Sequence, residues 1–245
     1  SAFLNRATHG LYPPGSVVKP IIYGVALGKQ LAEPTQIWLD EGSLALHNRT
    51  ISNSGGKPLG DISTDQALAL SSNVVFAQLA IALGDDLPVE LRRFGLGRDS
   101  EFELQNLRGF VPQRVDSDYD AAQLGLGQGE LLVTPLQMAV LSATIANGGV
   151  MMRPFVVQEV RGGLQMRQIT RPRVVDEVWP QHVAQDVRDA MVMAAKEGTA
   201  RTSFSTSLDY AAKTGTAQTS QGPAHAWFIG FAPSRLPKVA VAVLV

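Results

Sequence analysis

Cysteine is absent from the 245-residue chain. Its absence excludes disulfides, thiolate catalysis and zinc sites built on cysteine. Long apolar runs are missing as well: none reaches the ~18 residues that a membrane span requires. Apolar residues still make up 45% of the chain, which is enough for a sizeable core. The Asp and Glu residues show no metal-ligand spacing, so we expect neither a metal nor another cofactor.

An excess of charge of either sign is also lacking. Charged residues make up 18% of the chain and the net charge is −1. Lysine and arginine are scattered, and Arg92-Arg93 is the only adjacent pair. Because nucleic-acid binding usually needs clustered basic residues, we predict no nucleic-acid partner. The glycines at 125, 127 and 129 do not fit G-x-G-x-x-G, so no dinucleotide site is expected either.

The order of the expected elements indicates the fold class. Ser63–Gln66 has the form of a capping box, and Thr134-Pro135 is a strong helix start. Helices come first and strands last, which predicts an α+β fold rather than βαβ units. The short turns between the last strands make them antiparallel. The expected helices cover 16–28, 63–70, 73–84, 88–94, 134–147 and 180–196, and the expected strands cover 209–218, 225–232 and 238–245, with a hairpin around Gly162-Gly163. Residues 30–62 look irregular apart from short strand-like pieces at Ile37–Leu39 and Leu44–Leu46, and residues 95–130 are mostly loop.

A serine and a lysine stand three residues apart in PPGSVVKP, residues 13–20. In a helix, Ser16 and Lys19 would share one face, with Ser16 at the positive end of the helix dipole. This arrangement suits a nucleophile and its base, provided that the lysine loses its proton. The ordinary lysine pKa is about 10.4; burial and a nearby cation such as Lys213 would lower it.

The spacing recurs in Ser54-Gly-Gly-Lys57. Two central glycines disfavour a helix there, so nothing would hold Lys57 against Ser54. We therefore interpret this second copy as a loop without a catalytic role.

Ser71 and Asn73 lie in a break between two apolar helices. Their side chains suit a proton relay and an amide-binding group in a cleft. Asn73 could also cap the second helix, and the two roles are compatible.

A third group of polar residues, Lys213-Thr-Gly-Thr216, falls on an expected strand. Gly215 carries no side chain, which lets a substrate backbone lie along the strand. The cation of Lys213 and the hydroxyls of Thr214 and Thr216 suit a substrate carboxylate. The N–H groups of Ser16 and Thr216 could form an oxyanion hole.

These three motifs resemble those of the penicillin-recognising serine acyltransferases. The resemblance is closest to the transpeptidase domain of class B penicillin-binding proteins and runs from about residue 7 to 245. It is carried by YPPGSVVKP, LSSNVVFAQLA, GQGELLVTPLQMA, AKTGTAQ and AWFIGFAP. It implies an α+β fold in which helices flank an antiparallel sheet. It also implies a single transpeptidase domain over 1–245, with an all-helical lobe, about 30–150, inserted before the sheet strands at 209–245.

The family's chemistry implies that Ser16 attacks the penultimate D-Ala carbonyl of a peptidoglycan stem peptide and releases the terminal D-Ala. The acyl group then passes to an amine of a neighbouring stem, and β-lactams acylate Ser16 instead. Lys19 would be the base and Ser71 the relay. The implied catalytic residues are Ser16, Lys19, Ser71, Asn73 and Lys213; the implied substrate-binding residues are Thr214, Gly215 and Thr216.

The resemblance also implies features outside this sequence. The family fold has a helix and two strands before the serine motif and a closing helix after the last strand, so we expect the domain to be truncated at both ends. We expect the missing strands to pair with the apolar segment 238–245. No signal peptide opens the sequence; the family implies an extracytoplasmic location, a membrane anchor outside the chain, and cell-wall synthesis proteins as partners.

Three alternatives stay open on sequence grounds. A serine β-lactamase needs a base for deacylation, and Glu101 and Glu103 lie at the wrong spacing from Asn106, in what we expect to be a loop. A D,D-carboxypeptidase differs only in using water as the acceptor. A β-lactam sensor would be acylated once and then signal. His225 is expected at the surface rather than as a base.

Overall fold

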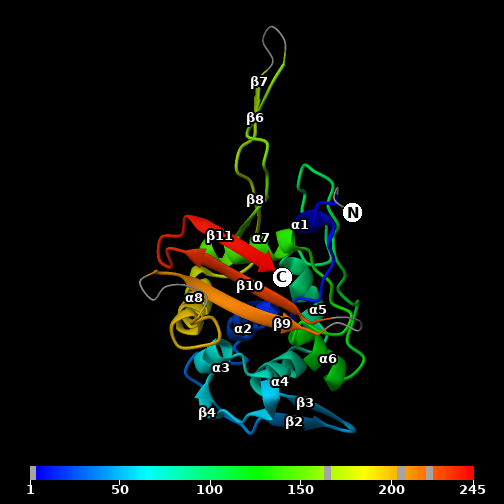
Figure 1. Ribbon diagram of the computed structural model, residues 1–245, viewed down its shortest axis with the longest axis vertical. Helices are drawn as coiled ribbons and strands as arrows, with labels where there is room; N and C mark the ends of the chain where they lie inside the picture. The colour runs from blue at the N-terminus through cyan, green and yellow to red at the C-terminus, as the bar shows by residue number, and fades with distance from the viewer. Residues whose placement is uncertain (1–3, 163–166, 203–207, 219–222) are drawn as a thin grey trace.

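The computed structural model describes residues 4–162, 167–202, 208–218 and 223–245. A three-stranded sheet lies over a layer of helices, with a second group of helices and short strands below it (Figure 1). The described helices are α1 Arg6–His9, α2 Lys19–Gly28, α3 Thr64–Leu70, α4 Asn73–Leu83, α5 Asp86–Arg93, α6 Asp118–Gly125, α7 Pro135–Ala146 and α8 Gln181–Lys196, with 3₁₀ turns η1 Gly15–Val18 and η2 Ser54–Gly56. The described strands are β1 Ile37–Asp40, β2 Ser43–Leu46, β3 Arg49–Ser52, β4 Gly60–Ser63, β5 Val150–Met152, β6 Glu159–Arg161, β7 Arg167–Ile169, β8 Val174–Glu177, β9 Ala211–Ala217, β10 His225–Ala232 and β11 Val239–Leu244.

The main sheet has the order β11-β10-β9 and is antiparallel throughout, as predicted. Trp227, Ile229 and Phe231 alternate along β10 and point into the core, where α7 and α8 cover the inner face. This placement sets β9 beside η1, the turn that leads into α2, which is where the candidate residues gather.

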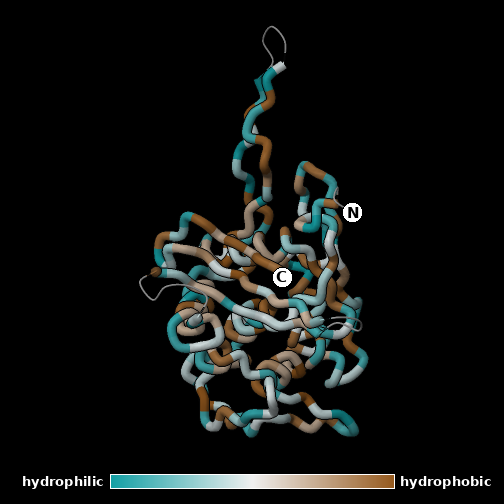
Figure 2. The backbone as a smooth tube through the Cα atoms, viewed as in Figure 1, coloured by the Kyte–Doolittle hydropathy of each residue, from teal (hydrophilic) through white to brown (hydrophobic). Residues whose placement is uncertain are grey.

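Strand β11 is apolar along its length (Figure 2). Its inward residues pack against the core, whereas Val239, Val241 and Val243 face outward and are exposed. Within the described residues β11 pairs with β10 alone. The pairing of further strands with 238–245 therefore stays a prediction.

The starts of two helices follow the sequence signals closely. Both capping boxes are present, at Ser63 for α3 and at Thr134 for α7. The lobe is not all-helical, however, because β1 pairs with β4 and β2 with β3 between residues 37 and 63. The strand-like pieces expected at 37–39 and 44–46 are β1 and β2, whereas β3 and β4 were missed, because four residues are too few for a clear alternating pattern. Helix α6 was also missed in the expected loop 95–130; its eight residues begin after Ser117, whose side chain accepts the N–H of Asp120.

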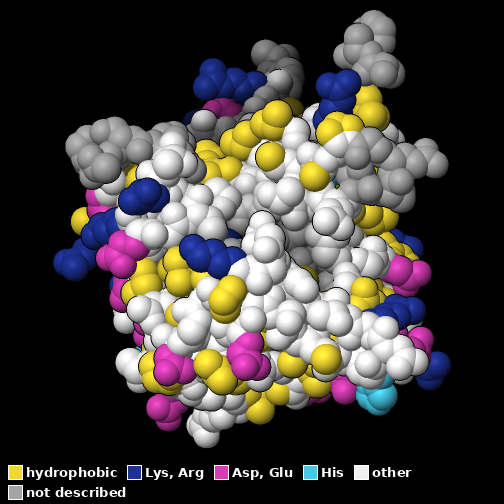
Figure 3. Space-filling model, turned by 60° about the horizontal axis from the view of Figure 1, so that its bottom comes forward, with side chains coloured by type: hydrophobic (Ala, Val, Ile, Leu, Met, Phe, Trp, Pro, Cys, Tyr) yellow, Lys and Arg dark blue, Asp and Glu magenta, His cyan; other side chains and the backbone are white. Residues whose placement is uncertain are grey.

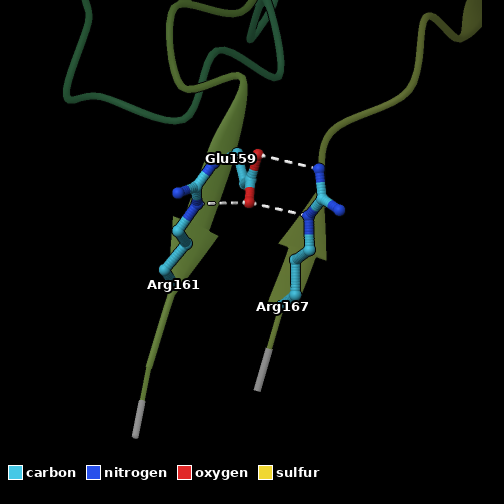
Figure 4. A network of polar contacts seen from close by, with 3 residues as sticks. All are labelled: Glu159, Arg161 and Arg167. Carbon is cyan, nitrogen blue, oxygen red and sulfur yellow. Dashed lines mark hydrogen bonds and ion pairs between the residues drawn. The ribbon is translucent and has the colours of Figure 1, made fainter. Parts of the chain in front are cut away.

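A hairpin formed by β6 and β7 projects from the body (Figure 1). Arg161 lies directly opposite Arg167 in the pair, and two like charges at such a position would repel. Glu159 lies between them and accepts a hydrogen bond of 2.7 Å from the Nε of each (Figure 4). These bonds lower the pKa of Glu159 and hold the two strands together.

The base of this hairpin is fastened by the two glutamates that were weighed as β-lactamase bases. Glu101 pairs with Arg173, and the Glu103 carboxylate accepts the backbone N–H of Val156 and, at 2.7 Å, that of Val157. The backbone bonds, with that from Val156 the larger contribution, lower the pKa of Glu103. Both side chains are therefore anchors of the hairpin.

The charged surface is mixed. On the face shown in Figure 3, acidic and basic side chains are scattered among uncharged ones. Among the described residues no single helix is both long and apolar enough to cross a membrane; α3 and α4 meet that standard only jointly, across a bend of 119°.

Candidate active site

The segment before Ser16 is fixed from both sides. The Pro13 carbonyl accepts a 2.9 Å hydrogen bond from the indole of Trp227 on β10. The Gly15 N–H donates to the Gly127 carbonyl at 2.9 Å, and both glycines have positive φ. A Cβ atom at position 127 would lie 2.1 Å from the Gly15 carbonyl oxygen, so only glycine fits. Ser16 is thus held between the sheet and the loop after α6.

Ser16 and Lys19 do not lie in one α-helix as expected. Residues 15–18 form the 3₁₀ turn η1, and α2 begins at Lys19, with Pro20 harmless in its first turn. In a 3₁₀ turn residues three apart eclipse one another, so the two side chains still leave the backbone on one side. Ser16 is partly exposed and Lys19 is fully buried.

The ammonium group of Lys19 is surrounded by oxygen atoms from the turn between α3 and α4. Its Nζ lies 2.8 Å from the Ser71 carbonyl, 3.1 Å from the Ser72 carbonyl and 2.7 Å from Oδ1 of Asn73. The Ser71 hydroxyl is next, at 3.4 Å. Burial, followed by the positive charge of Lys213, lowers the pKa of Lys19 well below its ordinary value, while Asp40 opposes the shift. Lys19 therefore gives up its proton more readily than an ordinary lysine does.

Lys213 of β9 approaches the same hydroxyl from the other side. Its Nζ donates to Ser71 Oγ at 2.9 Å and to the Thr214 carbonyl at 2.8 Å. Burial lowers the pKa of Lys213 to about 7. Ser71 itself has φ +62°, a left-handed conformation that strains a residue with a side chain, by about 1–3 kcal/mol. The strained turn places one hydroxyl between two buried lysines.

Strand β9 runs directly past the serine. A Cβ atom at Gly215 would lie 2.9 Å from the backbone nitrogen of Val17 and 3.1 Å from that of Ser16. Close approach of the strand therefore requires glycine at this position. Thr214 is partly exposed and Thr216 is exposed, so both can reach a ligand beside Ser16.

This close approach yields a stability and activity prediction. Gly215→Ala is expected to push β9 away from η1, lower stability by about 1–3 kcal/mol and slow acylation about 10- to 100-fold. Thermal unfolding and the β-lactam acylation rate measure the two effects. Gly28→Ala is the matched control, because nothing lies near its added Cβ; it should gain up to about 1 kcal/mol. Unchanged acylation in Gly215→Ala would contradict the inferred contact.

The structure brings every predicted site residue into one place, and it adds others. The cap of α4 is Ser72 rather than Asn73, whose amide donates to the Ser52 carbonyl at 2.7 Å. Thr199, after α8, bonds the Thr214 hydroxyl at 2.7 Å and was missed, since nothing in its local sequence marks it. Asp40 and Asn53 were missed because residues 30–62 gave no clear pattern. Among the described residues no group of acidic and histidine side chains could hold a metal ion.

The α+β fold, with one serine and two buried lysines gathered beside its main sheet, agrees with the family that the three motifs resemble. The chain belongs to the penicillin binding protein transpeptidase domain family, whose sequence model matches residues 1–245. Peptidoglycan D,D-transpeptidase PbpA of Mycolicibacterium smegmatis is 37% identical over 100% of the chain and 52% of its own length. Peptidoglycan D,D-transpeptidase MrdA of Haemophilus influenzae is 29% identical over 98% of the chain and 42% of its own length. The chain thus spans about half the length of the curated relatives it matches.

Solved structures agree with this assignment. The D,D-transpeptidase domain of a peptidoglycan glycosyltransferase from Eggerthella lenta has a TM-score of 0.90 and 30% identity, covering 98% of the chain and 62% of its own. Penicillin-binding protein A from M. tuberculosis, in its imipenem acyl-enzyme complex, has a TM-score of 0.90 and 35% identity. The match covers 99% of the present chain and 57% of that structure's chain. The predicted family and the α+β fold class are confirmed.

Proposed function

We propose that this chain is the catalytic domain of a serine-type peptidoglycan D,D-transpeptidase that β-lactams acylate. One observation carries the proposal. The Nζ of Lys19 is buried one 3₁₀ turn from Ser16, and the Ser71 hydroxyl lies between it and Lys213. A buried amine next to a second cation is the means by which a lysine becomes a base near neutral pH.

The proposed reaction begins with attack of Ser16 Oγ on the penultimate D-Ala carbonyl, while the hydroxyl proton passes to neutral Lys19. The developing oxyanion is stabilised by the N–H groups of Ser16 and Thr216. The C–N bond then breaks, and the departing D-Ala amine takes a proton through the Ser71 hydroxyl. An amine of a second stem peptide attacks the acyl-enzyme, gives up its proton to the same groups and restores Ser16.

The remaining residues bind the donor in this proposal. Charged Lys213 and the hydroxyls of Thr214 and Thr216 take the terminal carboxylate. Asn73 offers its amide group, although one of its N–H donors is already bonded to Ser52. Gly215 leaves room for the donor backbone beside β9.

Intact-mass analysis after penicillin treatment tests the proposal. We expect one stoichiometric adduct on Ser16 that is lost slowly. Rapid turnover would indicate a β-lactamase, a function not favoured because Glu101 and Glu103 anchor the hairpin. A stem-peptide assay with an amine acceptor then separates the other candidates: transfer supports the transpeptidase, hydrolysis alone a carboxypeptidase, and neither a sensor.

The pH dependence of acylation follows from the two lysines. The rate should rise with pH as Lys19 loses its proton, at a pH well below the ordinary lysine pKa. It should fall above about pH 7 as Lys213 loses the charge that holds the β-lactam carboxylate. Acylation rates measured across pH give this bell-shaped profile. Because arginine stays charged, Lys213→Arg should remove the falling limb; a limb that persists would assign it to another group.

We also propose that residues 1–245 act as a single transpeptidase domain of a larger protein. That protein would be anchored to the cytoplasmic membrane, with this domain outside it and cell-wall synthesis proteins as partners. Fractionation of cells followed by labelling with a fluorescent penicillin tests the location.

A further inference from the structure

A buried carboxylate stands behind the turn that holds Lys19. Asp40, the last residue of β1, is fully buried. Its Oδ2 accepts a 2.5 Å hydrogen bond from the Ser72 hydroxyl, and its Oδ1 accepts bonds from Asn53 Nδ2 at 2.7 Å and the Gly42 N–H at 2.8 Å. The ion pairs formed among the described side chains do not include Asp40. A buried carboxylate without a direct ion pair is costly, so its retention calls for a reason.

Both side chains bonded to Asp40 are linked by hydrogen bonds to the surroundings of the Lys19 amine. Ser72, bonded to Oδ2, presents its carbonyl to Nζ at 3.1 Å. Asn53, bonded to Oδ1, accepts the N–H of Asn73 at 2.7 Å, and the Asn73 side chain accepts from Nζ at 2.7 Å. Two separate routes therefore run from one carboxylate to two of the acceptors around the amine.

We propose that Asp40 is a positioning residue for Lys19, acting through Ser72 and Asn53 to fix the turn that surrounds the amine. The proposal rests on the proposed function, in which Lys19 is the base. It gives a functional role to residues 37–53, which form short strands away from Ser16. Asp40 does not touch the substrate; it sets where Nζ lies and how strongly the proton is held.

The electrostatics of the site agree with this role. Two charged groups face Lys19: Lys213 from β9 and Asp40 from β1. Lys213, together with burial, lowers the pKa of Lys19, whereas Asp40 raises it. Without Asp40 the pKa of Lys19 would fall further, and a base that binds its proton too weakly takes it less readily from Ser16.

Asp40→Asn tests the proposal, because it keeps the size of the side chain and removes its charge. We expect the maximal rate of β-lactam acylation to fall about 10- to 100-fold. We also expect the rising limb of the pH profile to move to lower pH by about one unit, the size of a typical shift in a protein. A role confined to folding would lower the melting temperature without moving this limb. Asp61→Asn, an exposed carboxylate on the paired strand β4, is the matched control and should change neither.

A second variant keeps the test decisive if Asp40→Asn does not fold. Ser72→Ala removes one route to Lys19 and leaves the carboxylate charged, so the rate should fall with the rising limb unmoved. Wild-type rates in either folded variant would overturn the positioning role. Failure of the wild-type protein to be acylated at Ser16 would instead overturn the proposed function, so the two failures are distinguishable.

Discussion

Ser16→Ala is expected to abolish covalent labelling by β-lactams and transfer of stem peptides, with residual transfer lower by about 10⁵-fold or more. Alanine removes the only atom that the proposed reaction acylates. Because Ser16 is partly exposed and its hydroxyl has no hydrogen-bond partner among the described residues, folding should be nearly unaffected. The variant should also still bind β-lactams reversibly, since the proposed carboxylate site around Lys213 is intact. Intact mass after β-lactam treatment measures the loss of labelling, and thermal unfolding measures the stability of the variant.

The chain supplies a matched control for this experiment. Ser54 also precedes a lysine by three residues, but Ser54, in the short turn η2, and Lys57, directly after it, are both exposed. Ser54→Ala should be labelled at the wild-type rate. An adduct that persists in Ser16→Ala, or is lost in Ser54→Ala, would place the nucleophile elsewhere.

The comparison of these two motifs also indicates what the sequence could establish. A helix was expected at the first motif and a loop at the second, but both form a 3₁₀ turn. Burial separates them instead: Lys19 is fully buried, whereas Ser54 and Lys57 are exposed. Capping boxes, proline positions and the three terminal strands were predictable, since each depends on a few neighbouring residues. The family resemblance brought the rest of the motifs together.

The parts that were missed depend on contacts between distant segments. Asp40 meets Ser72, and Thr199 meets Thr214, only after the chain has folded. Four-residue strands such as β3 form because a partner strand is available, and they have too few residues to show a period. The left-handed conformation of Ser71 is likewise imposed by packing, since serine does not favour it. Contacts between residues so far apart in the sequence can be found only from the structure.

Lys19→Met should slow acylation about 10²- to 10⁴-fold, the range for loss of a positioned general base. Methionine is close to lysine in shape but has no amine, so the proton of Ser16 loses its acceptor. Three oxygen atoms of the turn at 71–73 also lose a donor, which destabilises the fold. The substitution at the same time replaces a buried polar amine by an apolar group, and this gain offsets part of that loss. We therefore expect a folded protein whose defect lies in the chemical step.

Two companion variants separate the role of a base from that of a cation. Lys57→Met changes the exposed lysine of the second motif and should acylate at the wild-type rate. Lys19→Arg retains a positive charge but cannot release its proton, since arginine stays protonated in proteins. If Lys19 is the base, Lys19→Arg is as slow as Lys19→Met, and neither rate rises with pH as the wild-type rate does. Recovery of acylation in Lys19→Arg would mean that Lys19 serves through its charge and that Ser16 is deprotonated by another group. The Ser71 hydroxyl, 2.9 Å from Lys213, would then be the remaining route for the proton.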